Sequence, residues 1–284
     1  MPFIANILKE FTGPDTTAEY WERARSPLNS TRIHLLKTFY VPDEILEHLS
    51  HDENKYVRKG VASHINTAPE LLAELSKDLS AFIRRGVARN SNTPQHILDS
   101  LSNDGDKPVL VLVAANTHTP LKTLWRFLER RTEYLKKTEA SSFGVESIFN
   151  FKLTSESIAA NPSATVPMLE LLYEDRDKFH IRHRLAGNPN CTPELLGNLL
   201  CDPLQIVRKK ALDHPGVTVP MLIRLFEHER SFRVIEFYDQ YSAVFKLYRH
   251  PLLPQAVKSV IESLWPEHNF KPLAHKKTSE KVLR

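Results

Sequence analysis

Arginine recurs along this chain at a constant interval, with an aspartate six positions before it in three cases. Arg32, Arg58 and Arg84 lie 26 residues apart, and Arg182 and Arg208 keep the same interval. The aspartate–arginine pairs are Asp52/Arg58, Asp78/Arg84 and Asp202/Arg208. In a stack of repeats, equal offsets place guanidinium groups in a column beside a column of carboxylates, where bidentate ion pairs form within and between repeats. We expect these residues to form a structural ladder rather than a phosphate site.

A second set of cations follows the arginine of each repeat and has no matching acid in the pattern. Its members are Lys59, Arg85, Arg89, His183, Arg184, Lys209 and Lys210. Aligned once per repeat, such cations would form a basic face that attracts an acidic protein or a phosphate backbone. Val111 and Glu156 interrupt the row in the middle repeats, and a solvated surface without a partner is the alternative interpretation.

The remaining reactive side chains match no catalytic or metal-binding motif. HExxH, a G-x-S-x-G elbow and a glycine-rich phosphate loop are absent from the sequence. The pairs His48/His51 and His180/His183 lack the three or four ligands that a metal site needs. We therefore expect no catalytic residue, no metal, no cofactor and no small-molecule substrate.

Short helices opened by prolines are the elements that must position these residues. Apolar residues at helical spacing follow each of Pro42, Pro69, Pro94, Pro120, Pro167, Pro193 and Pro220. The intervals between these prolines are 25 to 27 residues, apart from one of 47. In Thr93-Pro94, Thr119-Pro120 and Thr192-Pro193 we expect the threonine hydroxyl to cap a helix whose first turn contains the proline.

A second short helix carries the arginine of each repeat, as in segments 56–62, 82–88, 180–186 and 205–211. It ends at an asparagine or a histidine, namely His64, Asn90, Asn116, Asn161, Asn188 and His214. Because asparagine tolerates the left-handed conformation, we expect these residues to close the helix with a left-handed cap. The predicted unit is helix, turn, short helix, turn.

The consensus V-R-x-x-V-A-x-N-x-x-T-P-x-x-L-L-x-x-L-x-x-D resembles the leucine-rich repeat variant family, and more distantly HEAT-type repeats. It is clearest over Val41–Ser102 and Met168–Val219. The resemblance implies an all-α solenoid, a superhelix of two-helix repeats of about 26 residues in which α-helices alternate with short, often 3₁₀-like, helices.

The repeat period also predicts an order of segments along the chain. We expect N-terminal capping helices at 1–31, repeat blocks at 32–128 and 155–226, insertions at 129–154 and 227–247, a degenerate C-terminal repeat or cap at 248–270 and a basic disordered tail at 271–284. Both insertions are charged and aromatic. Because stacking needs no such excursion, we expect the first insertion to project from the superhelix and shape a binding face.

Composition limits the function classes. The net charge of +4 is far short of the excess expected of a histone-like protein, and charge alone indicates no partner. The two cysteines, Cys191 and Cys201, are too far apart along one helix for a disulfide and indicate a reducing compartment. No apolar run approaches the roughly 20 residues that span a bilayer. We expect no membrane partner and a cytoplasmic location.

Together these features predict a non-enzymatic repeat-protein scaffold. Its partner is expected to be another macromolecule, a protein in the first instance, bound through an extended face of the solenoid. The alternative is a nucleic-acid-binding HEAT-like protein, such as a DNA glycosylase-like repair enzyme that uses a basic groove with aromatic residues.

Overall fold

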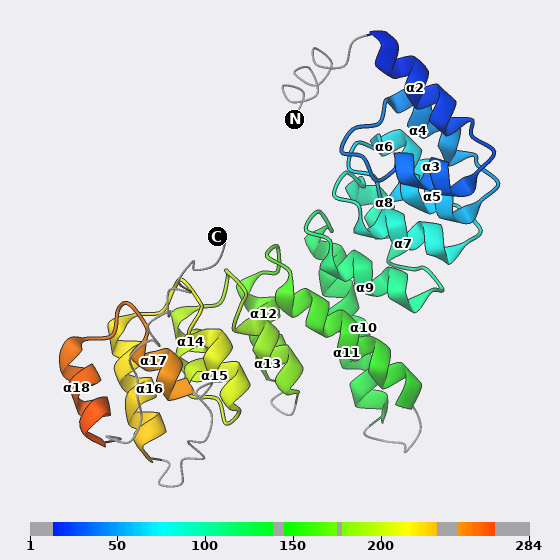
Figure 1. Cartoon of the computed structure of the whole chain (residues 1–284). Helices are drawn as coiled ribbons and strands as arrows, with labels where there is room; N and C mark the ends of the chain where they lie inside the picture. Colours follow the sequence, from blue (N-terminus) through cyan, green and yellow to red (C-terminus); the bar gives the residue numbers. More distant parts are fainter. Residues whose placement is uncertain (1–13, 139–144, 175–177, 232–242, 265–284) are drawn as a thin grey trace, which may run out of the picture. The chain divides into compact units, whose positions relative to one another are not determined.

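The computed structural model describes residues 14–138, 145–174, 178–231 and 243–264. Every regular element in these ranges is an α-helix, so the predicted all-α class is confirmed. The chain divides into two compact units, Met1–Leu172 and Tyr173–Arg284, and each is a stack of short helices (Figure 1).

The first unit is built from helix pairs that follow one another along the stack. The first helices of the repeats are α2 (Pro14–Ala24), α4 (Asp43–Ser50), α6 (Pro69–Leu75), α8 (Gln95–Leu101), α10 (Leu121–Thr138) and α12 (Val166–Tyr173). The second helices are α3 (Asn29–Leu35), α5 (Lys55–Ala62), α7 (Ala81–Arg89), α9 (Lys107–Ala115) and α11 (Val145–Ala160). Each second helix packs against the next one, from α3 to α11, which is the arrangement of a solenoid.

The second unit repeats this arrangement. Its helices are α13 (Phe179–Leu185), α14 (Pro193–Leu200), α15 (Gln205–Ala211), α16 (Val219–Ser231), α17 (Ala243–Tyr248) and α18 (Gln255–Leu264). The second helices α13, α15 and α17 pack in succession, and α14 packs against α16. The short helices that the resemblance implied to be 3₁₀-like are α-helical in both units.

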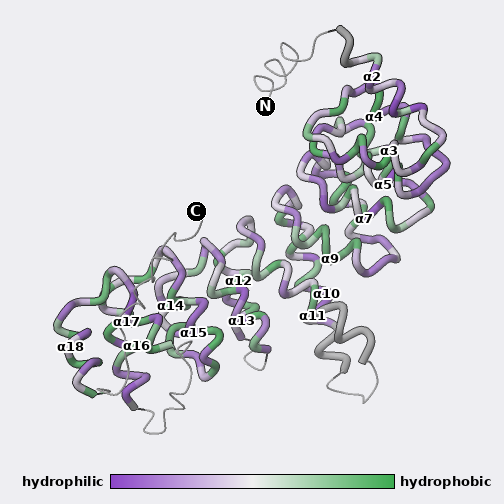
Figure 2. Tube along the Cα trace, viewed as in Figure 1, coloured by the Kyte–Doolittle hydropathy of each residue, from purple (hydrophilic) through white to green (hydrophobic). Residues whose placement is uncertain are grey.

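The core lies between the first and second helices, where apolar side chains recur at the repeat period. Equivalent leucines of the first helices are at most 1% exposed, namely Leu46, Leu72, Leu98, Leu124 and Leu169 in the first unit and Leu196 and Leu222 in the second. The second helices contribute Val57, Ile83, Val109, Ile181 and Val207, all fully buried. Hydrophobic and hydrophilic residues accordingly alternate along the helices (Figure 2). Burial of each such side chain contributes about 1.5 to 3 kcal/mol, so the leucine–valine seam drives stacking.

Glycine allows the second helices of the first unit to approach closely. A Cβ atom at Gly86 would lie 2.9 Å from Ala62 Cβ, and one at Gly60 would lie 2.7 Å from Leu36 Cδ1. Both distances are shorter than ordinary contacts between carbon atoms. A larger residue at Gly86 would push α5 and α7 apart, because Ala62 Cβ cannot rotate away, whereas a larger residue at Gly60 would displace the Leu36 side chain.

Buried asparagine amides join the turns of successive repeats. Asn90 Nδ2 donates to Ala62 O at 3.0 Å and to His64 O at 2.8 Å. Asn116 Nδ2 donates to Ala88 O and Asn90 O, both at 2.9 Å. Because each amide satisfies two carbonyls at the end of the preceding second helix, the asparagines form a ladder along the stack.

The same ladder continues with Asn161, whose Nδ2 donates to Ala114 O at 2.9 Å. Histidine fills the position at two other repeats. His64 Nε2 donates to Thr38 O at 3.0 Å, while its Nδ1 accepts from the Asn66 N–H. Burial lowers the pKa of His64, which keeps the ring neutral and able to both donate and accept.

The expected left-handed caps are wrong at Asn90 and Asn116. Asn90 has φ −70° and ψ 131°, and Asn116 has φ −71° and ψ 126°, both in extended conformation. Asparagine is needed for the hydrogen bonds of its side chain, not for a backbone conformation that other residues avoid.

The prediction that threonine caps the first helices is confirmed at one position and wrong at two. Thr192 Oγ1 accepts from the Leu195 N–H at 3.2 Å, as predicted. Thr93 Oγ1 instead donates to Val87 O, and Thr119 Oγ1 donates to Val113 O, each at 2.6 Å. In these two repeats the hydroxyl satisfies the end of the preceding second helix rather than the start of the next helix.

The insertions lengthen repeats instead of interrupting the stack. Residues 129–138 continue α10 and residues 145–154 begin α11, which packs against α9 as the next second helix. In the second insertion, residues 227–231 belong to α16 and residues 243–247 to α17. The remaining parts of both insertions lie outside the described residues.

The ends of the chain carry helices where caps were expected. The segment 1–31 contains α2 and the beginning of α3, and the segment 248–270 contains the end of α17 and α18. The predicted basic tail, 271–284, lies outside the described residues.

Replacing Asn116 with alanine should lower the free energy of unfolding by about 2 to 4 kcal/mol, because two buried carbonyls lose their donor. Urea denaturation measures this loss. The Asn116→His variant should retain more stability, since histidine fills this position in other repeats. As a control, Asn92→Ala should cost about 1 kcal/mol or less, because its bond to Ile65 O is exposed to water. Equal losses for Asn116→Ala and Asn92→Ala would contradict the ladder.

Candidate functional site

Each ladder arginine links the turn of its own repeat to the turn of the next. Arg84 Nη1 donates to Asp78 O at 2.8 Å and to Leu79 O at 3.1 Å. Its Nε and Nη2 donate to the two carboxylate oxygens of Asp104 at 2.6 and 2.9 Å. Asp104 Oδ1 also accepts from the Asp106 N–H. One guanidinium therefore orders two turns at once.

The ion pair runs forward to the following repeat, not back to the aspartate six positions earlier. That earlier aspartate contributes its backbone carbonyl, as Asp52 does for Arg58 at 2.8 Å. The pairs, with their shortest N–O distances, are Arg32–Asp52 at 2.7 Å, Arg58–Asp78 at 2.8 Å, Arg84–Asp104 at 2.6 Å, Arg182–Asp202 at 2.5 Å and Arg208–Glu229 at 2.5 Å. Sequence reasoning missed Asp104, although it continues the 26-residue series of Asp52 and Asp78, and it missed Glu229.

The ladder leaves its arginines saturated. The hydrogen bond from Arg84 holds the pKa of Asp104 below its ordinary value, and the same bond raises the pKa of Arg84. Both side chains stay charged and paired near neutral pH. The ladder therefore stabilises the stack and offers little to a ligand.

Arg85 is paired, which corrects the expectation that it has no acid. Its Nε and Nη2 donate to Asp106 Oδ1 and Oδ2 at 2.8 and 2.7 Å. Asp106 also caps α9 by accepting from the Val109 N–H. Because the carboxylate offsets the guanidinium charge, Arg85 adds little to a basic face.

Lys59 belongs to a cluster that we call the aromatic–basic patch, formed by Lys55, Tyr56, Lys59 and Phe82. The rings of Tyr56 and Phe82 meet edge to face with centroids 5.5 Å apart. Lys59 Nζ lies 5.2 Å from the Phe82 centroid, and Lys55 Nζ lies 5.5 Å from that of Tyr56. Tyr56 is 53% exposed. The patch joins equivalent positions of α5 and α7. Sequence reasoning missed the contact between Tyr56 and Phe82, although their separation of one repeat period could have predicted it.

Arg89 lies at the end of α7, beside a surface cavity of about 270 Å³. The cavity is lined by Ser63, Ile65, Gly86, Arg89, Asn90 and Ser91. A cation in the last turn of a helix also interacts favourably with the helix dipole, which gives Arg89 a structural role.

The other candidate cations belong to the second unit. His183 and Arg184 lie on α13, while Lys209 and Lys210 lie on α15. The Lys209 carbonyl accepts a bond from Lys246 Nζ at 2.8 Å. The seven cations are thus divided between the two units, and a continuous basic face across the chain stays a prediction.

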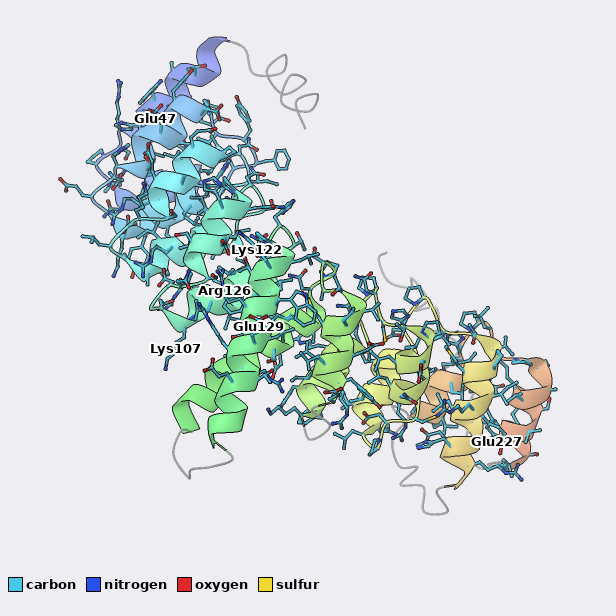
Figure 3. All side chains as sticks on the ribbon, turned by 180° about the vertical axis from the view of Figure 1, so that it is seen from behind. Glu47, Lys107, Lys122, Arg126, Glu129 and Glu227 are labelled. Atoms are coloured by element: carbon cyan, nitrogen blue, oxygen red, sulfur yellow. The ribbon has the colours of Figure 1, made fainter. Side chains whose placement is uncertain are left out.

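Asp99 forms a further cluster of charges between α8 and α10. It accepts hydrogen bonds from Thr123 and Arg126, and Lys122 Nζ lies 3.2 Å from its Oδ2. Lys122 and Arg126 are labelled in Figure 3. The hydrogen bond from Thr123 contributes most to lowering its pKa to about 2, with further bonds from Arg126 and Lys122. The cluster is an interhelical contact whose charges are paired.

Metal sites, reactive thiols and membrane spans each have requirements that can be compared with the described residues. Within the described ranges, no three histidine, cysteine, aspartate or glutamate residues are grouped to hold a metal ion. Burial raises the pKa of the Cys191 thiol to about 12, so it stays protonated and unreactive. No helix in the part of the chain that the structure describes is long and apolar enough to cross a membrane.

The fold and these surfaces define an all-α repeat protein of the solenoid class. No protein-family model and no curated protein matches the chain. Among solved structures, the chain is similar to a leucine-rich repeat variant with a novel repetitive protein structural motif. The identity is 21%, the match covers 83% of this chain and 82% of that chain, and the TM-score is 0.44. The likeness that the repeat consensus predicted concerns the fold alone.

Arg84→Ala should lower the free energy of unfolding by about 1 to 4 kcal/mol, because it leaves the Asp104 carboxylate and two turn carbonyls without their donor. Thermal or urea unfolding measures the effect. Arg84→Lys keeps the charge but cannot bond both turns, so it should recover only part of the loss. We call a ladder arginine that bonds two consecutive turns a clamp. An unchanged unfolding midpoint for Arg84→Ala would contradict this structural role.

The Asp99 cluster should make stability depend on pH in acid. Because folding lowers the pKa of Asp99 from 3.8 to about 2, its contribution is fully present above the ordinary value and is lost as the pH falls through the lowered one. Unfolding of the native chain and of Asp99→Asn should be compared across this window. The native chain should lose stability more steeply, and parallel curves would show that the cluster contributes nothing.

Proposed function

We propose that this chain is a non-enzymatic scaffold that binds an acidic segment of another protein through the aromatic–basic patch. The observation that carries the proposal is the contact between Tyr56 and Phe82 across two repeats, with a lysine over each ring. Neither Lys55 nor Lys59 forms an ion pair with another residue of the described ranges. The proposal includes a cytoplasmic location, in keeping with the free thiols Cys191 and Cys201.

The patch combines two properties that protein recognition requires. Exposed aromatic rings offer a large, rigid contact area at a small entropic cost, and such residues dominate binding energies at interfaces. The lysines raise the local potential, which attracts carboxylates and speeds association. An acidic segment with aromatic or aliphatic residues fits both properties.

The pairing of neighbouring cations favours a protein partner over nucleic acid. A phosphate backbone is tracked by positive charges at every repeat. Along α5, α7 and α9, the equivalent positions hold Lys59, Arg85 and Val111, and Asp106 neutralises the arginine. Among these three positions, Lys59 alone keeps an unpaired charge. This arrangement suits a short acidic segment better than a continuous polyanion.

Fluorescence anisotropy with three labelled probes tests the proposal on the full chain. The probes are a peptide of alternating acidic and aromatic residues, a single-stranded oligothymidylate and a DNA duplex. Lys55→Glu/Lys59→Glu should weaken peptide binding by about tenfold or more, equivalent to roughly 1.4 kcal/mol. The control Lys37→Glu/Lys77→Glu carries the same change in net charge on exposed lysines outside the patch and should leave binding nearly unchanged.

Tyr56→Ala distinguishes the patch from a general electrostatic effect, because it should weaken peptide binding without altering charge. Equal losses in both double variants would mean that only net charge matters. Tighter binding of either DNA probe, with a steep fall as salt rises, would replace the proposal with the nucleic-acid alternative.

A further inference from the structure

The second unit carries cations at a repeat position that is glycine in two repeats of the first unit. Gly60 and Gly86 stand two residues after the clamp arginines Arg58 and Arg84, and each lets neighbouring second helices approach. The corresponding residues after Arg182 and Arg208 are Arg184 and Lys210. Two long cations therefore occupy a position that also holds His34 and Leu112 in the first unit, so stacking does not require glycine there.

A second glycine makes room for one of these cations. A Cβ atom at Gly187 would lie 2.6 Å from Lys210 Cε and 3.3 Å from its Nζ. The lysine of α15 thus lies directly over the turn that follows α13. Any side chain at position 187 would displace it, so Gly187 keeps the ammonium group beside α13.

Further positive groups surround this lysine. His183 is half-buried, and burial is the main cause that lowers its pKa, followed by the positive charges of Arg184, Lys210 and His180. Arg184 and His180 lie on the same helix, whereas Lys210 comes from α15, which packs against it. Among the residues that the structure describes, no acid offsets these charges at His183. The arginines Arg182 and Arg208 take no part, since Asp202 and Glu229 saturate them.

We propose that His180, His183, Arg184 and Lys210, the α13–α15 cationic cluster, bind a phosphate-type oxyanion, either free or as a phosphomonoester. Like charges held together without an acid repel one another, and a bound dianion removes this repulsion. Arginine offers a planar pair of donors, lysine a compact charge and the imidazoles further N–H groups, which together suit a tetrahedral oxyanion. The site lies in the second unit and does not depend on the aromatic–basic patch.

Titration of the full chain with sulfate, inorganic phosphate and O-phosphoserine tests the cluster. Calorimetry gives the affinity, and NMR follows the imidazole signals of His183. All three anions should bind saturably at one site and shift those signals. Lys210→Ala and Arg184→Gly should each weaken binding by about fivefold to tenfold, as expected for loss of one charge-assisted contact. The control Lys77→Ala, an exposed lysine of the first unit, should bind as the native chain does.

The two sources of the oxyanion are separated by relative affinity. Tighter binding of O-phosphoserine than of inorganic phosphate assigns the site to phosphomonoesters, and the reverse order assigns it to the free anion. Arg184→Gly introduces the residue that stands at the equivalent positions Gly60 and Gly86, so its folding is expected to be intact even if Lys210→Ala unfolds.

Sulfate also provides a test of pH dependence, because its charge is constant near neutral pH. Protonation of His183 adds a donor and a charge, so sulfate binding should tighten as the pH falls, and His183→Gln should flatten that dependence. Absence of saturable binding would overturn the proposal. The proposal would also be overturned if Arg184→Gly and Lys210→Ala bound the anions as the native chain does while Lys210→Ala was less stable. Lys210 would then only stabilise the negative C-terminal end of the α13 dipole.

Discussion

The stack depends on one interaction, the arginine clamp between consecutive turns. Apolar columns such as Leu72 and Leu98 drive the helices together, but burial has no direction and would tolerate a slipped arrangement. A guanidinium that bonds two carbonyls of its own turn and the carboxylate of the next fits only one offset. The asparagine ladder fixes the opposite ends of the second helices in the same way. Directional bonds at both ends of a repeat thus convert general hydrophobic stacking into a fixed register.

A fixed register determines which surface residues become neighbours. Tyr56 and Phe82 are separated by one period, so the clamp at Arg58 brings their rings into contact although nothing in either repeat alone requires it. The charge of each clamp arginine is neutralised by the carboxylate that it binds. The surface potential therefore depends on cations outside the clamp. Lys59 and Arg85 occupy equivalent positions, but Asp106 neutralises Arg85 whereas Lys59 lies over the Phe82 ring and keeps its charge available.

The sequence was sufficient for the architecture because the period repeats the same local signals many times. Proline, the leucine face and the arginine recur together, and each occurrence supports the others. The pairing partner of the arginine could not be chosen from spacing, since the aspartate before it and the one after it both recur at the same period. The role of asparagine was predicted wrongly because two different causes place this residue at a helix end. One is its tolerance of the left-handed backbone conformation, and the other is the pair of hydrogen bonds that its side-chain amide donates. Asp106 was missed for the opposite reason: its equivalents are Asn54 and Ser80, so the acid that pairs with Arg85 belongs to no series.

The departures from the period carry the information about binding. The position two residues after the repeat arginine is not fixed by stacking, since the first unit has His34, Gly60, Gly86 and Leu112 there. In the second unit it holds Arg184 and Lys210, and Gly187 leaves open the space that the lysine fills. Like charges brought close together repel one another, and arrangements that cost stability in this way are expected mainly at functional sites. The grouping of positive charge on α13 and α15 is therefore the reason for proposing a ligand in the second unit.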